Sequence, residues 1–368
     1  MRVSIIDLKK RYINERKDIL KIIDRTLAKG NLVLTPEIEK FEKQICNYTG
    51  KKFCVTLNSG TDALMMALWS LGIGKGDEVI TSPISFIATA GAIVHVGAKP
   101  VFVDVNKDLN INVDLIESKI TRKTKVLMPV HWTGRICNMP KINSLARKYN
   151  LKVIEDSAQA MGSYYNNKHG GTFGDIGIFS AHPLKNLNAI GDAGFLITND
   201  SKVYNKIRHY RNHGLVSRDN VEFFGINSRM DTINSNILSY RLKKLKHIIS
   251  ARRKNVEIYR KNLNIKEIII PPCSKKEFNS FVMFIVLAKN RDGLKNYLSK
   301  KNIEALVYYG KPLHKQKAFK DKFIKKLKFP VSERICKEVI ALPHHQYMKK
   351  SEILYVSDQI KKFYKIKK

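Results

Sequence analysis

The chain has 368 residues, of which 43% are hydrophobic and 27% charged, an ordinary composition for a globular protein with a real core. No stretch reaches the ~18 uncharged apolar residues of a membrane span, and Asp7 and Lys9 come too early for an apolar signal segment, so we expect a cytoplasmic protein with no membrane partner. The formal net charge of +35 would suit nucleic acid, but no nucleic-acid-binding motif accompanies the spread-out lysines, so nucleic acid is not an expected partner.

Helices and strands alternate in the predicted order of the first two thirds of the chain. Apolar residues at helical spacing predict helices at 13–27 and 37–48, and a strand, a Ser-Gly-Thr turn and an apolar helix follow from residue 53. Further strands are predicted at 77–83, 98–105, 124–131, 151–160, 176–180 and 194–198, with helices at 86–97 and 140–149 between them. This alternation predicts an α/β fold with a mostly parallel sheet flanked by helices, in which ligands bind at the carboxyl ends of the strands.

The pattern changes near Met230. A long basic amphipathic helix is predicted from there to about Leu263, followed by a strand at 281–288, a helix at 291–302 and a strand at 303–309. We therefore expect a large α/β domain at 1–235 and a smaller C-terminal α+β domain at 236–368, against which the N-terminal segment can also pack. The five cysteines are scattered and form no zinc-ligand pair, so no metal site is expected.

Two segments carry polar groups to the ends of predicted strands. In NSGTDAL (58–64) a strand ends, Gly60 permits a tight turn and a helix begins at Thr61, so that unpaired backbone N–H groups and the helix dipole favour an anion such as a phosphate. Ordinary helix capping explains the same pattern. In VIEDSAQA (153–160) the strand ends near Asp156, whose carboxylate could bind a cationic ring nitrogen or could cap the next turn.

A third segment places one lysine in a polar loop between two strands. Lys185 follows the strand that ends at Ser180, and a loop lysine taken alone is usually exposed and inert. An aspartate at one strand end, a serine at the next and a lysine just beyond can nevertheless converge on one pocket. Partial burial beside a cationic ring would then lower the pKa of the lysine, so that it could form an imine and move protons.

With these segments in order, the chain resembles the sugar aminotransferases of the DegT/DnrJ/EryC1/StrS family, which have the aspartate aminotransferase fold (pyridoxal phosphate, PLP, fold type I). The resemblance covers nearly the whole chain, and its landmarks are IIDLKKRY, NSGTDAL, TSPISFIATA, PVHWTGRICNM, VIEDSAQA, FSAHPLKNLNAIGDAG, GINSRMD and IEALVYYGKPLH. One departure is Ala193, where a glycine is common, and a methyl group is tolerated there if φ is negative.

The resemblance implies PLP as the cofactor and a role for each matching residue. Lys185 matches the lysine that binds PLP as a Schiff base and moves the proton, and Asp156 matches the partner of the pyridine nitrogen. Four further positions match ligands of the phosphate: Gly60, Thr61, Asp62 and Ser180. Phe86 matches the aromatic residue that stacks on the ring, Gln159 a residue near the phenolic oxygen, and Asn227 an asparagine that comes from a neighbouring subunit. The asparagine implies a homodimer with shared active sites. Positions near the substrate match His182, Tyr309 and His314.

The implied reaction moves an amino group from glutamate or glutamine to a nucleotide-linked keto sugar, in lipopolysaccharide or other polysaccharide biosynthesis. The pair Gly191-Asp192 resembles members that act on 3-keto deoxy sugars, whereas members that act at C4 more often carry Gly-Glu. Three alternatives stay open: a 4-keto sugar aminotransferase, a PLP- or PMP-dependent sugar dehydratase, and a non-catalytic PLP-binding regulator. The dehydratases replace the Schiff-base lysine with histidine, which argues against that alternative because Lys185 is present.

Overall fold

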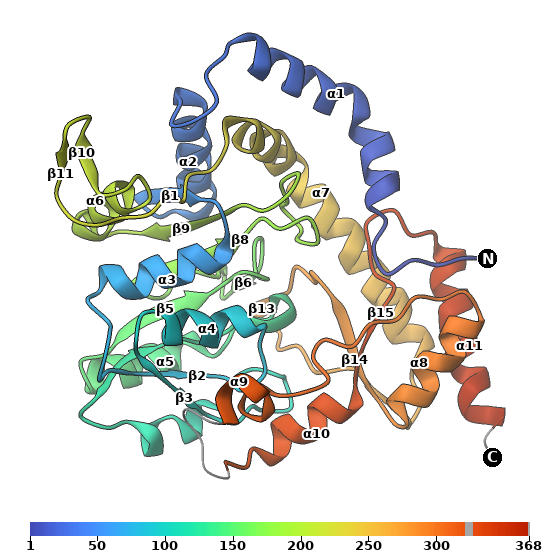
Figure 1. Cartoon of the computed structure of the whole chain (residues 1–368). Coiled ribbons are helices and arrows are strands. Elements are labelled where there is room, and N and C mark those ends of the chain that lie inside the picture. The colour runs from blue at the N-terminus through green and yellow to red at the C-terminus, as the bar shows by residue number, and fades with distance from the viewer. Residues whose placement is uncertain (321–326, 367–368) are drawn as a thin grey trace.

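A sheet of seven strands forms the centre of the protein in a computed structural model that describes residues 1–320 and 327–366 (Figure 1). Across the sheet the strands are β1 (Phe53–Leu57), β9 (Gly194–Thr198), β8 (Ile176–Ser180), β5 (Lys152–Asp156), β4 (Thr124–Leu127), β2 (Glu78–Thr81) and β3 (Lys99–Phe102). Neighbouring strands are parallel except at β9, which is antiparallel to β1 and β8. The expected mostly parallel sheet is confirmed.

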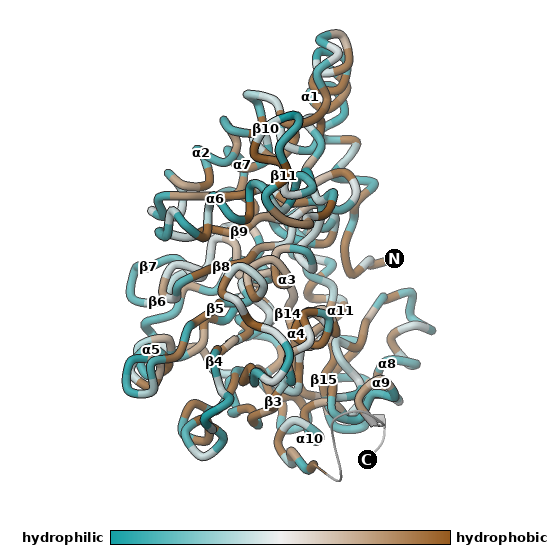
Figure 2. The backbone as a smooth tube through the Cα atoms, turned by 60° about the vertical axis from the view of Figure 1, so that its left-hand side comes forward, coloured by the Kyte–Doolittle hydropathy of each residue, from teal (hydrophilic) through white to brown (hydrophobic). Residues whose placement is uncertain are grey.

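Helices cover both faces of this sheet. They are α2 (Pro36–Thr49), α3 (Gly60–Ser70), α4 (Ile87–His95), α5 (Met139–Lys148), α6 (Ser201–Tyr210) and α7 (Thr232–Asn262), whereas α1 (Leu8–Ala28) packs on α7. Along β9, Leu196 packs into the core with α3 and α6, whereas Phe195 and Ile197 pack into the core with α2 and α7. β9 is therefore apolar on both faces, as expected for a strand in a sheet that helices cover on both sides, and Figure 2 shows apolar segments along β5, β8 and β9.

The C-terminal part adds a smaller antiparallel sheet, β12 (Ile268–Ile269), β14 (Phe284–Ala288) and β15 (Val339–Leu342). Its helices are α8 (Arg291–Lys300), α9 (Lys317–Lys320), α10 (Pro330–Glu338) and α11 (Lys350–Ile366). Val3 from the N-terminal segment and Val256 from α7 share the core of this part. The predicted domain boundary between residues 235 and 236 lies in the first turns of α7, which runs from one part to the other.

Short elements complete the chain. They are the strands β6 (Tyr164–Tyr165), β7 (Lys168–His169), β10 (Leu215–Ser217), β11 (Asn220–Val221) and β13 (Glu277–Phe278), and the 3₁₀ turns η1 (Val113–Leu115), η2 (Glu117–Lys119), η3 (Trp132–Gly134) and η4 (Leu313–Lys315). Among the helices within the described ranges, none is both long and apolar enough to cross a bilayer.

The prediction of a strand at 303–309 is wrong. Ile303 forms an isolated bridge with Val3, and Leu306 forms another with Ala341. Because the segment changes its pairing partner after three residues, it does not form a continuous ladder. Its last residues, Tyr308 and Tyr309, line a cavity instead.

Candidate active site

A cavity of about 290 Å³ opens where the carboxyl ends of the central strands face the smaller part. The predicted site residues that line it are Gly60, Thr61, Phe86, Asp156, Gln159, Ser180, His182, Lys185 and Tyr309. They come from segments far apart in the sequence: the turn before α3, the start of α4, the ends of β5 and β8, the β8–β9 loop and the segment after residue 306. The structure therefore brings an amine, a carboxylate and a helix N-terminus to one cavity.

Lys185 and Asp156 interact electrostatically in this cavity. Burial lowers the pKa of Lys185 to about 8, and the attraction of Asp156 opposes that shift only in part. Burial also raises the pKa of Asp156, against the opposing effects of its hydrogen bonds and of Lys185. An amine with a pKa near 8 is partly neutral at physiological pH, which suits it for attack on an aldehyde and for moving protons.

The carboxylate of Asp156 is held in a fixed orientation. Thr89 on α4 donates its hydroxyl to Oδ2 at 2.6 Å, and the backbone N–H of Ala158 donates to Oδ1 at 3.2 Å. Ser85 in turn lies 2.6 Å from the Thr89 hydroxyl. Sequence reasoning missed Thr89, because a threonine in an apolar helix carries no local sign of a contact 67 positions away.

The start of α3 and Ser180 form a site for an anion, here called the anion cup, where three segments approach one another closely. Ser59 caps α3 by accepting the N–H of Asp62 at 3.0 Å. A Cβ on Gly60 would lie 2.8 Å from the Cβ of Ser180, and a Cβ on Gly194 would lie 2.4 Å from the carbonyl of Ser59. Glycine at both positions thus lets α3 start directly against β8 and β9. The φ of Ala193 is not among the positive values of the described residues, so its methyl group fits.

Aromatic rings form one wall of the cavity. The ring centroids of Phe86 and Tyr309 are 6.3 Å apart, and Trp132 stacks on Tyr309 at 6.3 Å. Gln159 accepts the N–H of Thr133 at 2.8 Å and also hydrogen-bonds the Tyr309 side chain. Phe86 is 56% exposed, so its ring face is available to a flat ligand.

These groups fit PLP. The N-terminus of α3 suits its phosphate, the buried carboxylate of Asp156 suits its pyridinium nitrogen, and the amine of Lys185 suits its aldehyde. The exposed ring of Phe86 suits its aromatic face.

Comparisons with known proteins agree with this geometry. Residues 14–361 match the model of the DegT/DnrJ/EryC1/StrS aminotransferase family. The chain belongs to this family.

Several relatives in the DegT/DnrJ/EryC1/StrS family match over nearly their whole length. A dTDP-3-amino-3,6-dideoxy-alpha-D-galactopyranose transaminase from Aneurinibacillus thermoaerophilus is 37% identical over 98% of this chain and 99% of its own. A protein from Geobacillus stearothermophilus named pleiotropic regulatory protein is 35% identical over 99% of both chains. A crystal structure of S. venezuelae DesV in complex with a ketimine intermediate has a TM-score of 0.96 at 32% identity, over 98% of each chain.

Three residues with family-implied roles lie outside the cavity lining. Asp62 uses its N–H to cap α3, and its carboxylate accepts the Ser228 hydroxyl at 2.6 Å. Asn227 is exposed, and its Oδ1 accepts Arg229 Nε at 3.0 Å. His314 is buried with Nε2 3.2 Å from Glu333, and burial lowers its pKa.

His182 lies at the cavity lining beside residues for which the sequence predicted no role in the site. Burial lowers the pKa of His182, and Asp192 opposes that shift. Ile5, Ile6 and Met283 form an apolar part of the lining. Local sequence gives these residues no sign of a role in the site, because the N-terminal segment and the segment before β14 reach the cavity only through the tertiary fold.

Proposed function

We propose that this DegT/DnrJ/EryC1/StrS protein is a PLP-dependent aminotransferase that moves an amino group from glutamate or glutamine to a nucleotide-linked keto sugar. PLP is the cofactor. The observation that carries the proposal is the meeting of Lys185, Asp156 and the N-terminus of α3 in one cavity. The name of the A. thermoaerophilus relative, a transaminase of a dTDP-linked 3-amino sugar, supports transfer of the amino group to a sugar.

When bound, PLP would supply an electron sink for the negative charge that develops at the donor's α-carbon. The chain supplies orientation and proton transfer. Asp156, fixed by Thr89, would hold the ring nitrogen protonated, and the first turn of α3 with Ser180 would bind the phosphate. Lys185 would take the proton from the α-carbon of the donor, a task that suits its pKa of about 8.

For the acceptor we propose a 3-keto deoxy sugar. Its support is the Gly191-Asp192 pair, with Asp192 in the cavity lining, and the name of the relative from A. thermoaerophilus, which refers to a 3-amino-3,6-dideoxy sugar. His182, Tyr309 and Asp192 offer polar groups to sugar hydroxyls. The product would enter lipopolysaccharide or another polysaccharide.

We also propose a homodimer in which Asn227 reaches the phosphate of the partner's site. The support is an exposed set of large apolar side chains on and after α1 and near the cavity, Leu8, Tyr12, Ile13, Leu20, Leu27, Leu32, Val33, Leu34, Leu184 and Ile190. Exposed apolar side chains that lie together in this way are typical of an interface between subunits.

A second candidate function is regulation without catalysis, which the name of the G. stearothermophilus relative favours. The complete set of Lys185, Asp156 and anion cup argues against it, since a regulator needs no lysine with a lowered pKa.

One experiment tests the proposal and separates the two functions. Protein loaded with PLP is incubated with glutamate or glutamine and a panel of 3-keto and 4-keto sugars linked to dTDP, UDP or GDP, and products are read by mass. We expect an amino sugar from a 3-keto substrate and none from Lys185→Ala protein. If no amino group is transferred to any of the sugars, nor to PLP from either donor, the proposed activity fails and regulation without catalysis is favoured.

A further inference from the structure

A buried arginine that lies outside the cavity holds the backbone of the loop that carries Lys185. Arg241 on α7 is 5% exposed, and its Nη1 donates to the carbonyl oxygens of Asn188 at 2.8 Å and of Ala189 at 3.2 Å. Within the loop, the Asn188 amide donates to the carbonyl of Pro183. The backbone is thus tied on both sides of Lys185.

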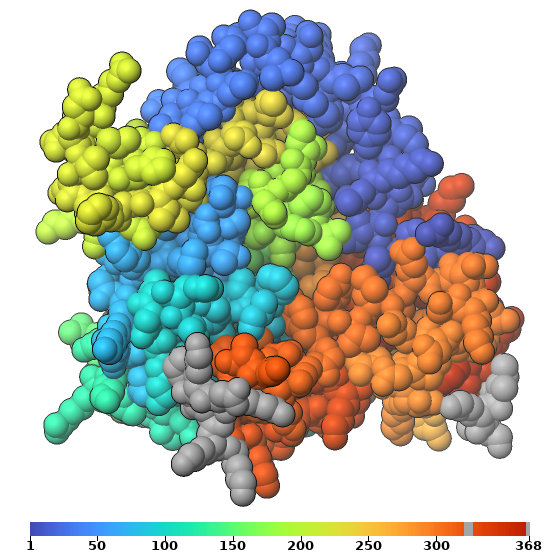
Figure 3. Space-filling model, viewed as in Figure 1, coloured from blue at the N-terminus to red at the C-terminus, as the bar shows by residue number. Residues whose placement is uncertain are grey.

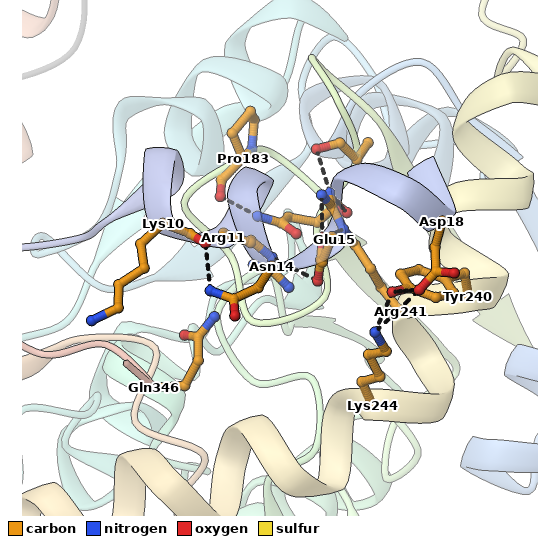
Figure 4. Close-up of polar contacts among 12 residues, drawn as sticks. Lys10, Arg11, Asn14, Glu15, Asp18, Pro183, Tyr240, Arg241, Lys244 and Gln346 are labelled. Atoms are coloured by element: carbon orange, nitrogen blue, oxygen red, sulfur yellow. Dashed lines mark hydrogen bonds and ion pairs between the residues drawn. The ribbon is translucent and has the colours of Figure 1, made fainter. Parts of the chain in front are cut away.

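A buried carboxylate on α1 fixes this arginine. Glu15 is 3% exposed, and its Oε2 lies 2.9 Å from Nε and 2.8 Å from Nη2 of Arg241. Its Oε1 lies 3.5 Å from Nε of Arg11, a second buried arginine. Figure 4 shows Glu15 between Arg11 and Arg241, with Pro183 of the loop nearby. In Figure 3 the yellow-green β8–β9 segment lies against the blue N-terminal helices.

The chemistry of the contact explains why arginine occupies this position. Buried carbonyl groups need donors, and the β8–β9 loop has no strand partner for Asn188 and Ala189 within the described residues. A planar guanidinium can bind a carboxylate with one edge and carbonyl oxygens with another, whereas an ammonium cannot span both. A buried ion pair of this kind often contributes more to one defined geometry than to stability.

The N-terminal segment extends the effect to the cavity. Ile5 and Ile6 line the cavity directly before α1 begins, and the backbone N–H of His344 donates to the carbonyl of Ile5 at 3.2 Å. The docking of α1 through Glu15 therefore sets one cavity wall and the lysine loop together.

We infer that Glu15 and Arg241 are positioning residues that hold the amine of Lys185 at the cofactor by clamping residues 183–189 between α1 and α7. The inference rests on the proposed function, because it takes Lys185 as the reacting amine. Neither residue lines the cavity, so both act through the loop.

The test compares Arg241→Met, Arg241→Lys and Glu15→Gln with Tyr240→Phe. Tyr240 is the matched control, because its hydroxyl also joins α7 to α1, through Asp18 at 2.6 Å, without contacting the loop. In cofactor-free protein, hydrogen exchange of the amides at 182–190 should be roughly tenfold faster or more in Arg241→Met, because both hydrogen bonds from Arg241 to the loop carbonyls are lost. Exchange in β5 and β8 should be unchanged.

The loaded enzymes give a second readout. Because a misplacement of about 1 Å can cost ~10²-fold in rate, kcat should fall by about that factor in Arg241→Met while KM for the donor changes little. Arg241→Lys should restore part of kcat, and the pH midpoint of the cofactor's visible absorbance should move in both variants. Tyr240→Phe should match the wild type in each measurement.

The outcomes separate this inference from the proposed function. If the wild type forms no visible PLP complex and transfers no amino group, the proposed function fails. If the wild type is active but loop exchange and absorbance midpoint stay unchanged in the variants, or Tyr240→Phe changes them equally, the clamp is overturned. If Arg241→Met does not fold, Glu15→Gln and Arg241→Lys decide the result, since each keeps a polar side chain in place.

Discussion

At the scale of single residues, burial and one carboxylate determine what Lys185 can do. The chain is rich in lysine, so position and not residue type distinguishes the reacting amine. Removal from water lowers the pKa of Lys185 to about 8, and Asp156 keeps it from falling further. The same carboxylate that fits the ring nitrogen therefore also tunes the amine.

This balance predicts an unusual pH dependence of labelling in cofactor-free protein. At pH 7 the neutral fraction of an amine with a pKa of about 8 is roughly 300-fold that of an ordinary lysine at 10.5. An amine reagent read by peptide mass should thus label Lys185 early, with a midpoint near pH 8. Asp156→Asn removes the attraction that raises the pKa, so the midpoint should shift to lower pH. A shift to higher pH, or a midpoint near 10.5 in the wild type, would contradict this account.

At the scale of elements, the site depends on how closely the start of α3 approaches β8 and β9. Gly194 in β9 lies under the carbonyl of Ser59, and Gly60 lies against Ser180. The apolar strand pattern places these elements in one sheet, but the glycines allow the last close approach that forms the anion cup.

Gly194→Ala should weaken this cup. The added methyl group would lie 2.4 Å from the Ser59 carbonyl, and overpacking of this kind costs about 1–3 kcal/mol of unfolding free energy. We expect the dissociation constant for PLP, measured by absorbance titration, to rise as α3 is displaced. Gly91→Ala in α4 is the control, because no atom lies within 4 Å of its added Cβ and alanine favours a helix. Equal PLP affinity in Gly194→Ala and wild type would remove this explanation of the cup.

The local sequence pattern predicted those strands that pair with one neighbouring strand along their whole length. It failed for a segment whose pairing partner changes along its length. The strands at 176–180 and 194–198 have the predicted bounds, since each pairs along its whole length. The segment 303–309 has strand-like composition but changes its partner from Val3 to Ala341. Asp156 and Lys185 could be predicted as site residues because the sequence places one at the end of a predicted strand and the other in a polar loop between two predicted strands. Thr89 and Arg241 could not, because their partners are set only by the packing of α4 and α7.

At the scale of the whole molecule, the cavity lies between parts that α7 connects. Its lining takes Asp156 from the large sheet, Met283 from the segment before β14 and Ile5 from the N-terminal segment. Asn227 is exposed, and its side chain accepts a hydrogen bond from the half-buried Arg229 at 3.0 Å. The proposed homodimer would give this asparagine a function in the neighbouring site.

A complementation experiment tests the shared site. Lys185→Ala and Asn227→Ala proteins should each be inactive or weak as pure homodimers. After unfolding and refolding as an equal mixture, half of the dimers are mixed, and each mixed dimer has one site with both residues intact, so about a quarter of wild-type activity should return. Activity no higher than the average of the two pure variants would show that Asn227 acts in its own subunit or not at all.

The most direct test of the central claim is to find the lysine that binds the cofactor. Protein loaded with PLP is reduced with borohydride, which fixes the cofactor to its amine, then digested and mapped by mass. The account predicts modification of Lys185 alone at one cofactor per chain, and no visible complex in Lys185→Ala protein. Modification of a different lysine, or an equal spread over many lysines, would contradict it.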